Sequence, residues 1–177
     1  MAFEQTYRSA WSRFLAFAAV GLAIAFGVSL LLARDAGTTL RWAPALLLLG
    51  IGGWLAYGRP EVRVDDDGVT LQNVLRRIVV PWAALAEVDS RYGLRLETTD
   101  GQRWSAWAVP APVGLQRARG EETEAALLVR QRWEQLRGQG AITAGSDARV
   151  RVEPDPYALT VIGVLAVATP LSALLVR

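Results

Sequence analysis

The chain contains no histidine and no cysteine. The first absence removes the commonest general base, and the second removes the thiol nucleophile, disulfides and most zinc or iron–sulfur sites. Lysine is also absent, so all 19 basic residues are arginine, and they are interspersed with 17 acidic residues to give a net charge of +2. A nucleic-acid binder needs a one-sided basic field. The composition therefore argues against nucleic-acid binding and excludes much enzyme chemistry.

Long apolar runs are what the sequence has in excess. The mean hydropathy is +0.23, and the apolar residues gather in three blocks, at 14–33, 42–57 and 157–176. At 1.5 Å per residue, the first and third are long enough to cross the ~30 Å hydrocarbon core. The second is shorter, and it spans if its terminal aromatic residues, Trp42 and Tyr57, lie at the two interfaces. We predict three transmembrane helices.

A cleaved signal peptide is the alternative for the first run. Its apolar region would be shorter and would be followed by a small-residue cleavage site, whereas Arg34 and Asp35 follow directly here. We therefore expect the first run to be a membrane helix.

The charges beside the runs predict the topology. The connection 34–41 is short enough only for a hairpin, so the N-terminus and segment 58–156 share one side and the C-terminus lies on the other. Arginines near the membrane are more numerous on the shared side than opposite it, where they are Arg34, Arg41 and Arg177. Because cytoplasmic flanks are enriched in arginine, we predict a multi-pass plasma-membrane protein with a cytoplasmic domain and N-terminus.

Small residues recur along the first helix. Gly21, Ala25 and Ser29 are spaced by four, which places them on one stripe where another helix can approach closely. The stripe is a candidate interaction site for a partner or for self-association. Packing within the protein's own helices, and the general richness in alanine and glycine, are the open alternatives.

From Glu61 onward the hydrophobic period becomes two, which predicts half-buried strands. Val62 and Val64 precede Asp67-Gly68, a two-residue turn signal that would pair Val64 with Leu71. A third strand, a corner and a fourth strand are predicted next, carried by Ile78–Val80, Pro81-Trp82, and Leu85 with Val88.

A second hairpin is predicted at Asp100-Gly101. A two-residue turn there places Leu94 opposite Trp107, and it places Trp104 on the same face as Arg95. We therefore expect Trp107 in the core and Trp104 outside it. Trp104 with Arg95 is a candidate contact surface, the alternative being that the ring covers the arginine stem.

Residues 121–137 have helical spacing, with an apolar stripe that should cap the sheet. A flexible stretch follows at 138–147, and a final short strand is predicted at 149–153. The domain organisation predicted is a transmembrane hairpin, a soluble domain, a linker and a third membrane helix, at residues 1–58, 59–137, 138–156 and 157–177.

The strands around Asp67-Gly68, the Arg77 to Trp82 segment and the later Val88 resemble the bacterial pleckstrin-homology-like domains of small actinobacterial membrane proteins, the low-molecular-weight protein antigen family. The resemblance covers the membrane hairpin and residues 61 to 137, and it leaves the third membrane helix unsupported. The fold class expected is a membrane protein with three transmembrane α-helices plus a small α+β pleckstrin-homology-like domain, whose antiparallel strands are capped by one C-terminal helix.

Two charged motifs are candidates for binding a metal ion, a lipid or a partner. Asp65, Asp66 and Asp67 suggest a metal site, but alternate strand residues point to opposite faces, so a solvated hairpin tip is the better interpretation. Pleckstrin-homology domains that bind phosphoinositides use basic residues in the first hairpin, so the resemblance implies that this acidic tip repels such lipids. Arg76-Arg77 is a candidate contact for anionic lipid or a partner, and solvated strand-end charge is the plainer alternative.

No nucleophile elbow, phosphate loop or carboxylate pair is recognisable, so we predict neither enzymatic activity nor a cofactor. The function predicted is a membrane-anchored protein-interaction module, a scaffold or accessory subunit of a larger bacterial membrane or envelope complex. Its expected partners are the bilayer and a membrane protein or a second copy, without nucleic acid or small-molecule substrate. The alternative is a domain that senses anionic lipid through Arg76, Arg77 and Arg63.

Overall fold

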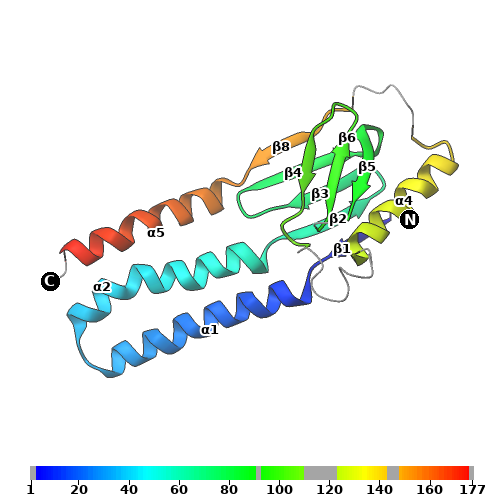
Figure 1. Cartoon of the computed structure of the whole chain (residues 1–177). Coiled ribbons are helices and arrows are strands. Elements are labelled where there is room, and N and C mark those ends of the chain that lie inside the picture. The colour runs from blue at the N-terminus through cyan, green and yellow to red at the C-terminus, as the bar shows by residue number, and fades with distance from the viewer. Residues whose placement is uncertain (1–2, 91–92, 110–122, 143–147, 176–177) are drawn as a thin grey trace. The chain divides into compact units, whose positions relative to one another are not determined.

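The computed structural model describes residues 3–90, 93–109, 123–142 and 148–175 (Figure 1). The chain divides into two compact units. One comprises Met1–Ser9 and Pro60–Glu153, and the other Ala10–Arg59 and Pro154–Arg177. Residues 110–122, which include the predicted start of the helix at 121, and residues 143–147 of the predicted flexible stretch lie outside the described residues.

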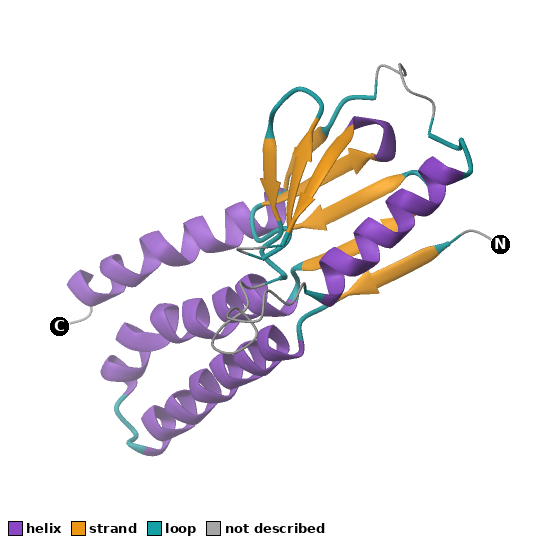
Figure 2. Ribbon diagram, turned by 45° about the vertical axis from the view of Figure 1, so that its right-hand side comes forward, coloured by secondary structure: helices purple, strands orange, loops and turns teal. Residues whose placement is uncertain are grey.

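In its described residues, the first unit is built from two sheets and one α-helix (Figure 2). The five-stranded sheet has the order β1-β2-β3-β4-β8, and the three-stranded sheet has the order β5-β6-β7. Their bounds are β1 Glu4–Tyr7, β2 Glu61–Asp65, β3 Gly68–Gln72, β4 Arg76–Pro81, β8 Arg151–Pro154, β5 Leu85–Asp89, β6 Arg95–Thr98 and β7 Arg103–Ser105. The short 3-10 turn Trp82–Ala84 forms the predicted corner between β4 and β5.

The β2–β3 hairpin has the predicted faces but not the predicted register. Val64 lies opposite Val69 rather than Leu71, because the turn is formed by Asp66 and Asp67 and not by Asp67 and Gly68. The Asp65 carboxylate stabilises this turn by accepting the backbone N–H groups of Asp67 and Gly68, at 3.0 and 2.9 Å. A slip of two residues preserves the strand faces, so the alternating valines and leucine are buried as predicted.

The β6–β7 hairpin slips by one residue, and this reverses the predicted faces. Leu96 lies opposite Trp104, because Thr98 donates its N–H to the Gln102 carbonyl and so closes a three-residue loop. Gly101, at φ +79°, supplies the left-handed conformation that such a loop requires. A one-residue shift turns every later side chain to the other face. Trp104 therefore packs against the core and Trp107 is 56% exposed, the opposite of the prediction.

A single hydrophobic core lies between the two sheets and α4 (Glu124–Gly138). The helix begins at Glu124, after the predicted start at 121, because the Thr123 hydroxyl caps it by accepting the Ala126 N–H. Its predicted apolar stripe is confirmed, since Ala125, Val129 and Leu136 are buried and Leu128 and Trp133 pack against the core. Figure 2 shows α4 lying alongside the strands, where it covers the core as the capping helix.

Two edge strands modify the predicted division of the chain. Residues 4–7, which the prediction placed with the membrane hairpin, form β1 and pair with β2. Residues 151–154, within the predicted linker, form β8 beside β4, close to the predicted final strand. The β-rich unit therefore draws on chain segments before the first apolar helix and up to the start of the last one.

The Asp66 carboxylate fastens β1 and α4 to the tip of the β2–β3 hairpin. It accepts the Phe3 N–H at 3.0 Å and forms an ion pair with Arg132, whose guanidinium lies 4.3 Å from the centre of the Phe3 ring. The Phe3 hydrogen bond, followed by the bond to Arg132, lowers the pKa of Asp66 below its ordinary value. The acidic tip thus has a structural use within the domain.

The second unit consists of three helices long and apolar enough to cross a membrane: Ala10–Leu32, Ala36–Gly58 and Pro156–Leu175. They are α1, then α2 (Ala36–Leu47) continued by π-helical turns over Leu48–Gly52 and Trp54–Gly58, and α5. The second helix begins six residues before the predicted Trp42, because the Asp35 carboxylate caps it by accepting the Thr38 N–H at 3.2 Å. Its length then suffices for spanning without the help of the interfacial anchors.

Small residues bring the first two helices together. A side-chain carbon added at Gly53 would lie 2.4 Å from the Ala19 Cβ, and one added at Gly50 would lie 3.2 Å from the Ala23 Cβ. Such close backbone approach is the usual means by which helices associate in membranes, where lipid removes the hydrophobic driving force. The face of α1 that meets the second helix is therefore the one carrying Ala19 and Ala23.

Gly68 should be the least replaceable glycine of the β-rich unit. A Cβ there would lie 2.3 Å from the Val80 carbonyl oxygen and 2.9 Å from the Pro81 Cα, so backbone must shift. We expect Gly68→Ala to lower the free energy of unfolding by about 1–3 kcal/mol, measured by thermal unfolding in detergent. Gly138→Ala is the control, since its Cβ meets nothing within 4 Å. Equal stability of the two variants would contradict this account.

Asp66→Asn should remove a contribution to stability that the ionised Asp66 carboxylate makes and that wild type loses at acid pH. Because the folded-state pKa is lowered, the contribution is complete above the ordinary value of 3.8 and is lost as pH falls through the folded pKa. We expect Asp66→Asn to be less stable than wild type at neutral pH, and the difference to shrink below pH 4, in denaturant titrations. Asp67→Asn is the control, because Asp67 contributes backbone groups to the turn. A difference that does not vary with pH would refute the role of the carboxylate.

Candidate functional site

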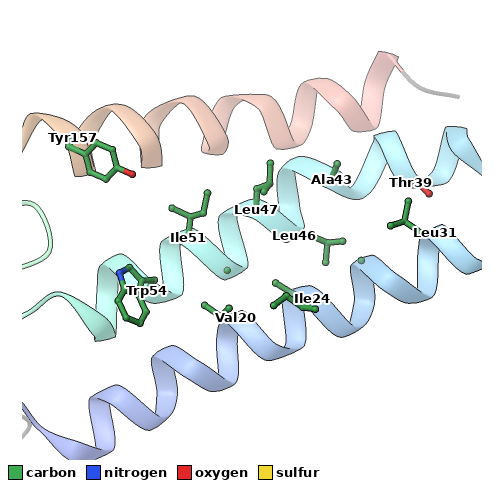
Figure 3. A pocket seen from close by; sticks show the side chains of 13 residues that line it. Val20, Ile24, Leu31, Thr39, Ala43, Leu46, Leu47, Ile51, Trp54 and Tyr157 are labelled. Carbon is green, nitrogen blue, oxygen red and sulfur yellow. The ribbon is translucent and has the colours of Figure 1, made fainter.

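An apolar groove runs along the helices of the second unit. It has a volume of about 650 Å³, and α1 and the second helix supply nearly all of its lining. Figure 3 shows Val20, Ile24 and Leu31 along one side, Leu46 and Ile51 along the other, and Tyr157 of α5 near one end. The second helix lies between α1 and α5 (Figures 1 and 3), so the three form a row with an open side.

Several polar contacts lie at the Tyr157 end of this unit. Arg59 pairs with Asp155 at 2.9 Å, and its guanidinium lies 5.8 Å from the centre of the Tyr157 ring. Asp155 also accepts the Ala158 N–H at 3.0 Å, which caps the start of α5. These contacts join the end of the second helix to the start of α5.

The predicted small-residue stripe is exposed. Gly21, Ala25 and Ser29 all lie on the open surface of α1, and a side-chain carbon added at Gly21 would meet nothing within 4 Å. At 100° per residue, the stripe lies on roughly the opposite side of the helix from Ala19 and Ala23. Among the described residues, then, internal helix packing uses a different face of α1 from the stripe.

The side chain of Asn73 connects the two sheets at one corner of the β-rich unit. Its Nδ2 donates to the Ser105 carbonyl at 3.0 Å, and its Oδ1 accepts the Trp107 N–H at 2.8 Å. The Asn73 N–H also donates to the Arg76 carbonyl at 2.9 Å, which closes the turn between β3 and β4. These bonds bring the β3–β4 turn and the Trp107 backbone together at Asn73. We call the surface around it the Asn73 corner, and it comprises Leu75, Arg76, Arg77 and Trp107.

The predicted contact residues of the domain divide into two groups. Arg76 and Arg77 are exposed at the Asn73 corner. Trp104 was predicted to be an exposed contact, but it is half-buried under the Arg76 guanidinium, which lies 5.9 Å from the ring centre. The shifted β6–β7 register explains this difference. Arg95 is half-buried too, and its Nε donates to the Ser105 hydroxyl at 3.4 Å.

Leu75 and Trp107 are surface residues that sequence reasoning missed. Leu75 is 43% exposed and Trp107 is 56% exposed. Leu75 carried a usable signal, since it is an apolar residue in a turn immediately before two arginines. Trp107 carried none, because its exposure depends on the length of a loop.

Mixed charge occupies the open face of the three-stranded sheet. A hollow of about 200 Å³ there is lined by Glu87, Asp89, Arg95, Glu97 and Arg103. The Arg103 Nε donates to Glu97 at 2.8 Å across the strands. Because both signs alternate over this face, it presents no single-sign field to a charged ligand.

Two of the three acidic residues at the β2–β3 turn make contacts within the domain. The part of the chain that the structure describes contains no group of three or more acidic residues arranged to hold a metal ion. The Asp65 carboxylate accepts a hydrogen bond in the turn, and the Asp66 carboxylate bonds to Phe3 and Arg132. The apolar groove, the stripe and the Asn73 corner are the features that offer surface for a partner.

Comparison with known proteins bears on the β-rich unit. No curated protein and no solved structure matches the chain. The family model described as the bacterial PH domain matches residues 59–153, which is more than half of the chain and extends past the predicted boundary at 137 to include β8. The antiparallel strand pairs and the C-terminal helix α4 agree with that match. The chain therefore belongs to the bacterial PH domain family.

Proposed function

We propose that the chain is a membrane-anchored interaction module, an accessory subunit or scaffold of a larger bacterial membrane complex. The observation that carries this proposal is the exposed stripe of Gly21, Ala25 and Ser29 on a helix that already packs through a different small-residue face. A helix with two such faces is suited to contact one helix within the chain and another outside it.

The open row of helices supports the same proposal. A bilayer offers no hydrophobic force between helices, so association depends on close packing and on surface shape. The groove of about 650 Å³ adds a second concave surface beside α1. The apolar surface of the three helices would anchor the module, and its specificity would come from the stripe and the groove.

The placement in the cell belongs to the proposal as well. The helices would lie in the plasma membrane, with the PH domain and the N-terminus cytoplasmic and the C-terminus outside, as the distribution of arginine near the membrane favours. The actinobacterial origin and the kinship with the low-molecular-weight protein antigen family are proposed on the matching residues and on a basic composition made of arginine alone. The action proposed is binding without turnover or cofactor.

One of the three arginines in the lipid-sensing alternative is paired with acidic residues of the domain itself. The Arg63 guanidinium pairs with Glu4 at 3.2 Å and with Glu61 at 3.3 Å, so its charge is compensated within the domain. Arg76 and Arg77 are exposed, so the alternative now rests on these two arginines.

The direct test is purification from the native membrane in mild detergent, with the co-purifying proteins identified and their stoichiometry measured by mass spectrometry. A stoichiometric membrane protein is the expected result. Recovery of the chain alone, in a defined oligomeric form, would count against a stable heteromeric subunit.

The role of the stripe is tested by Gly21→Leu. A leucine side chain there would separate the two helix backbones, so we expect the amount of co-purifying partner to fall at least tenfold, roughly the effect of 1.4 kcal/mol. Gly163→Leu in α5 is the matched control, since Gly163 is another exposed glycine with open space around it. Equal retention of the partner by both variants would show that the stripe is not the contact.

A further inference from the structure

The strand register determines at which end of the sheet the Asn73 corner lies. Glu61 at the start of β2 is paired with Gln72, and Gln72 is paired with Arg77. Arg77 is thus two strands from Glu61, roughly 10 Å at the usual strand spacing. Tyr7, the last residue of β1, pairs with Val62 beside them. The Asn73 corner therefore shares its end of the sheet with the end of β1 and the start of β2.

This is also the end from which the chain continues into its apolar helices. Only Arg8 and Ser9 separate β1 from α1, and only Arg59 and Pro60 separate the second helix from β2. Segments this short span roughly 10 Å at most. The acidic tip at Asp66 and Asp67 is at the other end of the same strands. The corner and the connections to the apolar helices therefore lie at the same end of the five-stranded sheet, and the acidic tip lies at the other end.

The side chains of the corner have the composition of a membrane-interface contact. Trp107 and Leu75 expose apolar surface, and Arg76 and Arg77 place two positive charges beside it. Tryptophan is enriched at the headgroup level of bilayers, and arginines near an anionic surface are attracted to it. The three bonds of Asn73 hold the Trp107 backbone and the β3–β4 turn in one arrangement. The corner would therefore lose little conformational entropy on docking.

We propose that the Asn73 corner docks on the anionic headgroup layer of the bilayer in which the helices are anchored. Trp107 and Leu75 enter the interface, and Arg76 and Arg77 lie over lipid phosphates. A soluble protein partner is the less favoured occupant, because the corner lies at the end of the sheet from which the chain continues into its apolar helices. The inference rests on the membrane anchoring proposed above, and it adds a second attachment point that orients the PH domain.

The absence of cysteine permits a direct test on the full-length chain, because a single introduced cysteine is the only site that reacts with a fluorescent label. Three variants are reconstituted separately into nanodiscs containing phosphatidylglycerol and a lipid quencher. Leu75→Cys reports the corner, Val164→Cys reports an exposed position of α5, and Gln102→Cys reports an exposed loop at the far end of the three-stranded sheet. We expect strong quenching at 75 and 164 and little at 102.

The outcomes separate the two proposals. Quenching at 164 with a water-exposed label at 75 overturns the docking inference and leaves the anchoring intact. Labels unquenched at both positions overturn both. Equal quenching at 75 and 102 also overturns the inference, because it would reflect general proximity rather than this corner.

Charge neutralisation tests the arginines. Arg76→Gln and Arg77→Gln, added to the Leu75→Cys chain, should each lower the ratio of docked to undocked corner by about fivefold in phosphatidylglycerol nanodiscs. Nanodiscs of phosphatidylcholine alone should reproduce the loss without any substitution. Arg103→Gln is the control, because Arg103 is exposed but paired with Glu97. Unchanged quenching in both arginine variants and in phosphatidylcholine would overturn the assignment of anionic headgroups.

Discussion

The pairing of β2 on both of its edges is the constraint on which the β-rich unit depends. One edge bonds to β1, which precedes the first apolar helix, and the other to β3, so segments more than fifty positions apart are held in one sheet. The valines that alternate along β2 are completely buried, and Asp66 at its tip bonds both Phe3 and Arg132. Loss of β2 would release the N-terminal strand, part of the core and the contact to α4 together.

The α1 helix carries small residues both on the face that packs internally and on an exposed face. Ala19 and Ala23 meet the second helix at distances that exclude larger side chains, whereas Gly21 and Ala25 lie in open space. In water, exposed glycine and alanine on a helix would be unremarkable. In a bilayer, a small-residue surface reduces the separation of backbones, which is the main source of helix association there. Selection for close packing is a physical reason for small residues on both faces.

Periodicity predicted the elements well, and loop length decided where the prediction failed. Alternation located β2 to β7 and the helical stripe located α4, because burial imposes periods of two and 3.6 on any sequence. Trp104 and Trp107 were exchanged because the Thr98 loop has three residues where two were assumed. β1 was missed because Glu4–Tyr7 has no apolar alternation of its own, and it is ordered by pairing to β2 and by the Asp66 contact. The pairing of β1 and its Asp66 contact are long-range effects, which a local pattern does not contain.

The one-residue slip also accounts for the surface on which the docking inference stands. It places Trp107 outside the core, where the Asn73 amide holds its backbone beside a turn that carries Leu75 and two arginines. Attachment through the helices alone would leave the PH domain free to rotate about its short connections. A second contact at the interface would reduce that freedom, and it would leave the remaining faces of the domain in a limited set of orientations. Partner binding through the helices and lipid contact through the corner are compatible proposals, since the first would select what is bound and the second would limit the orientation of the domain.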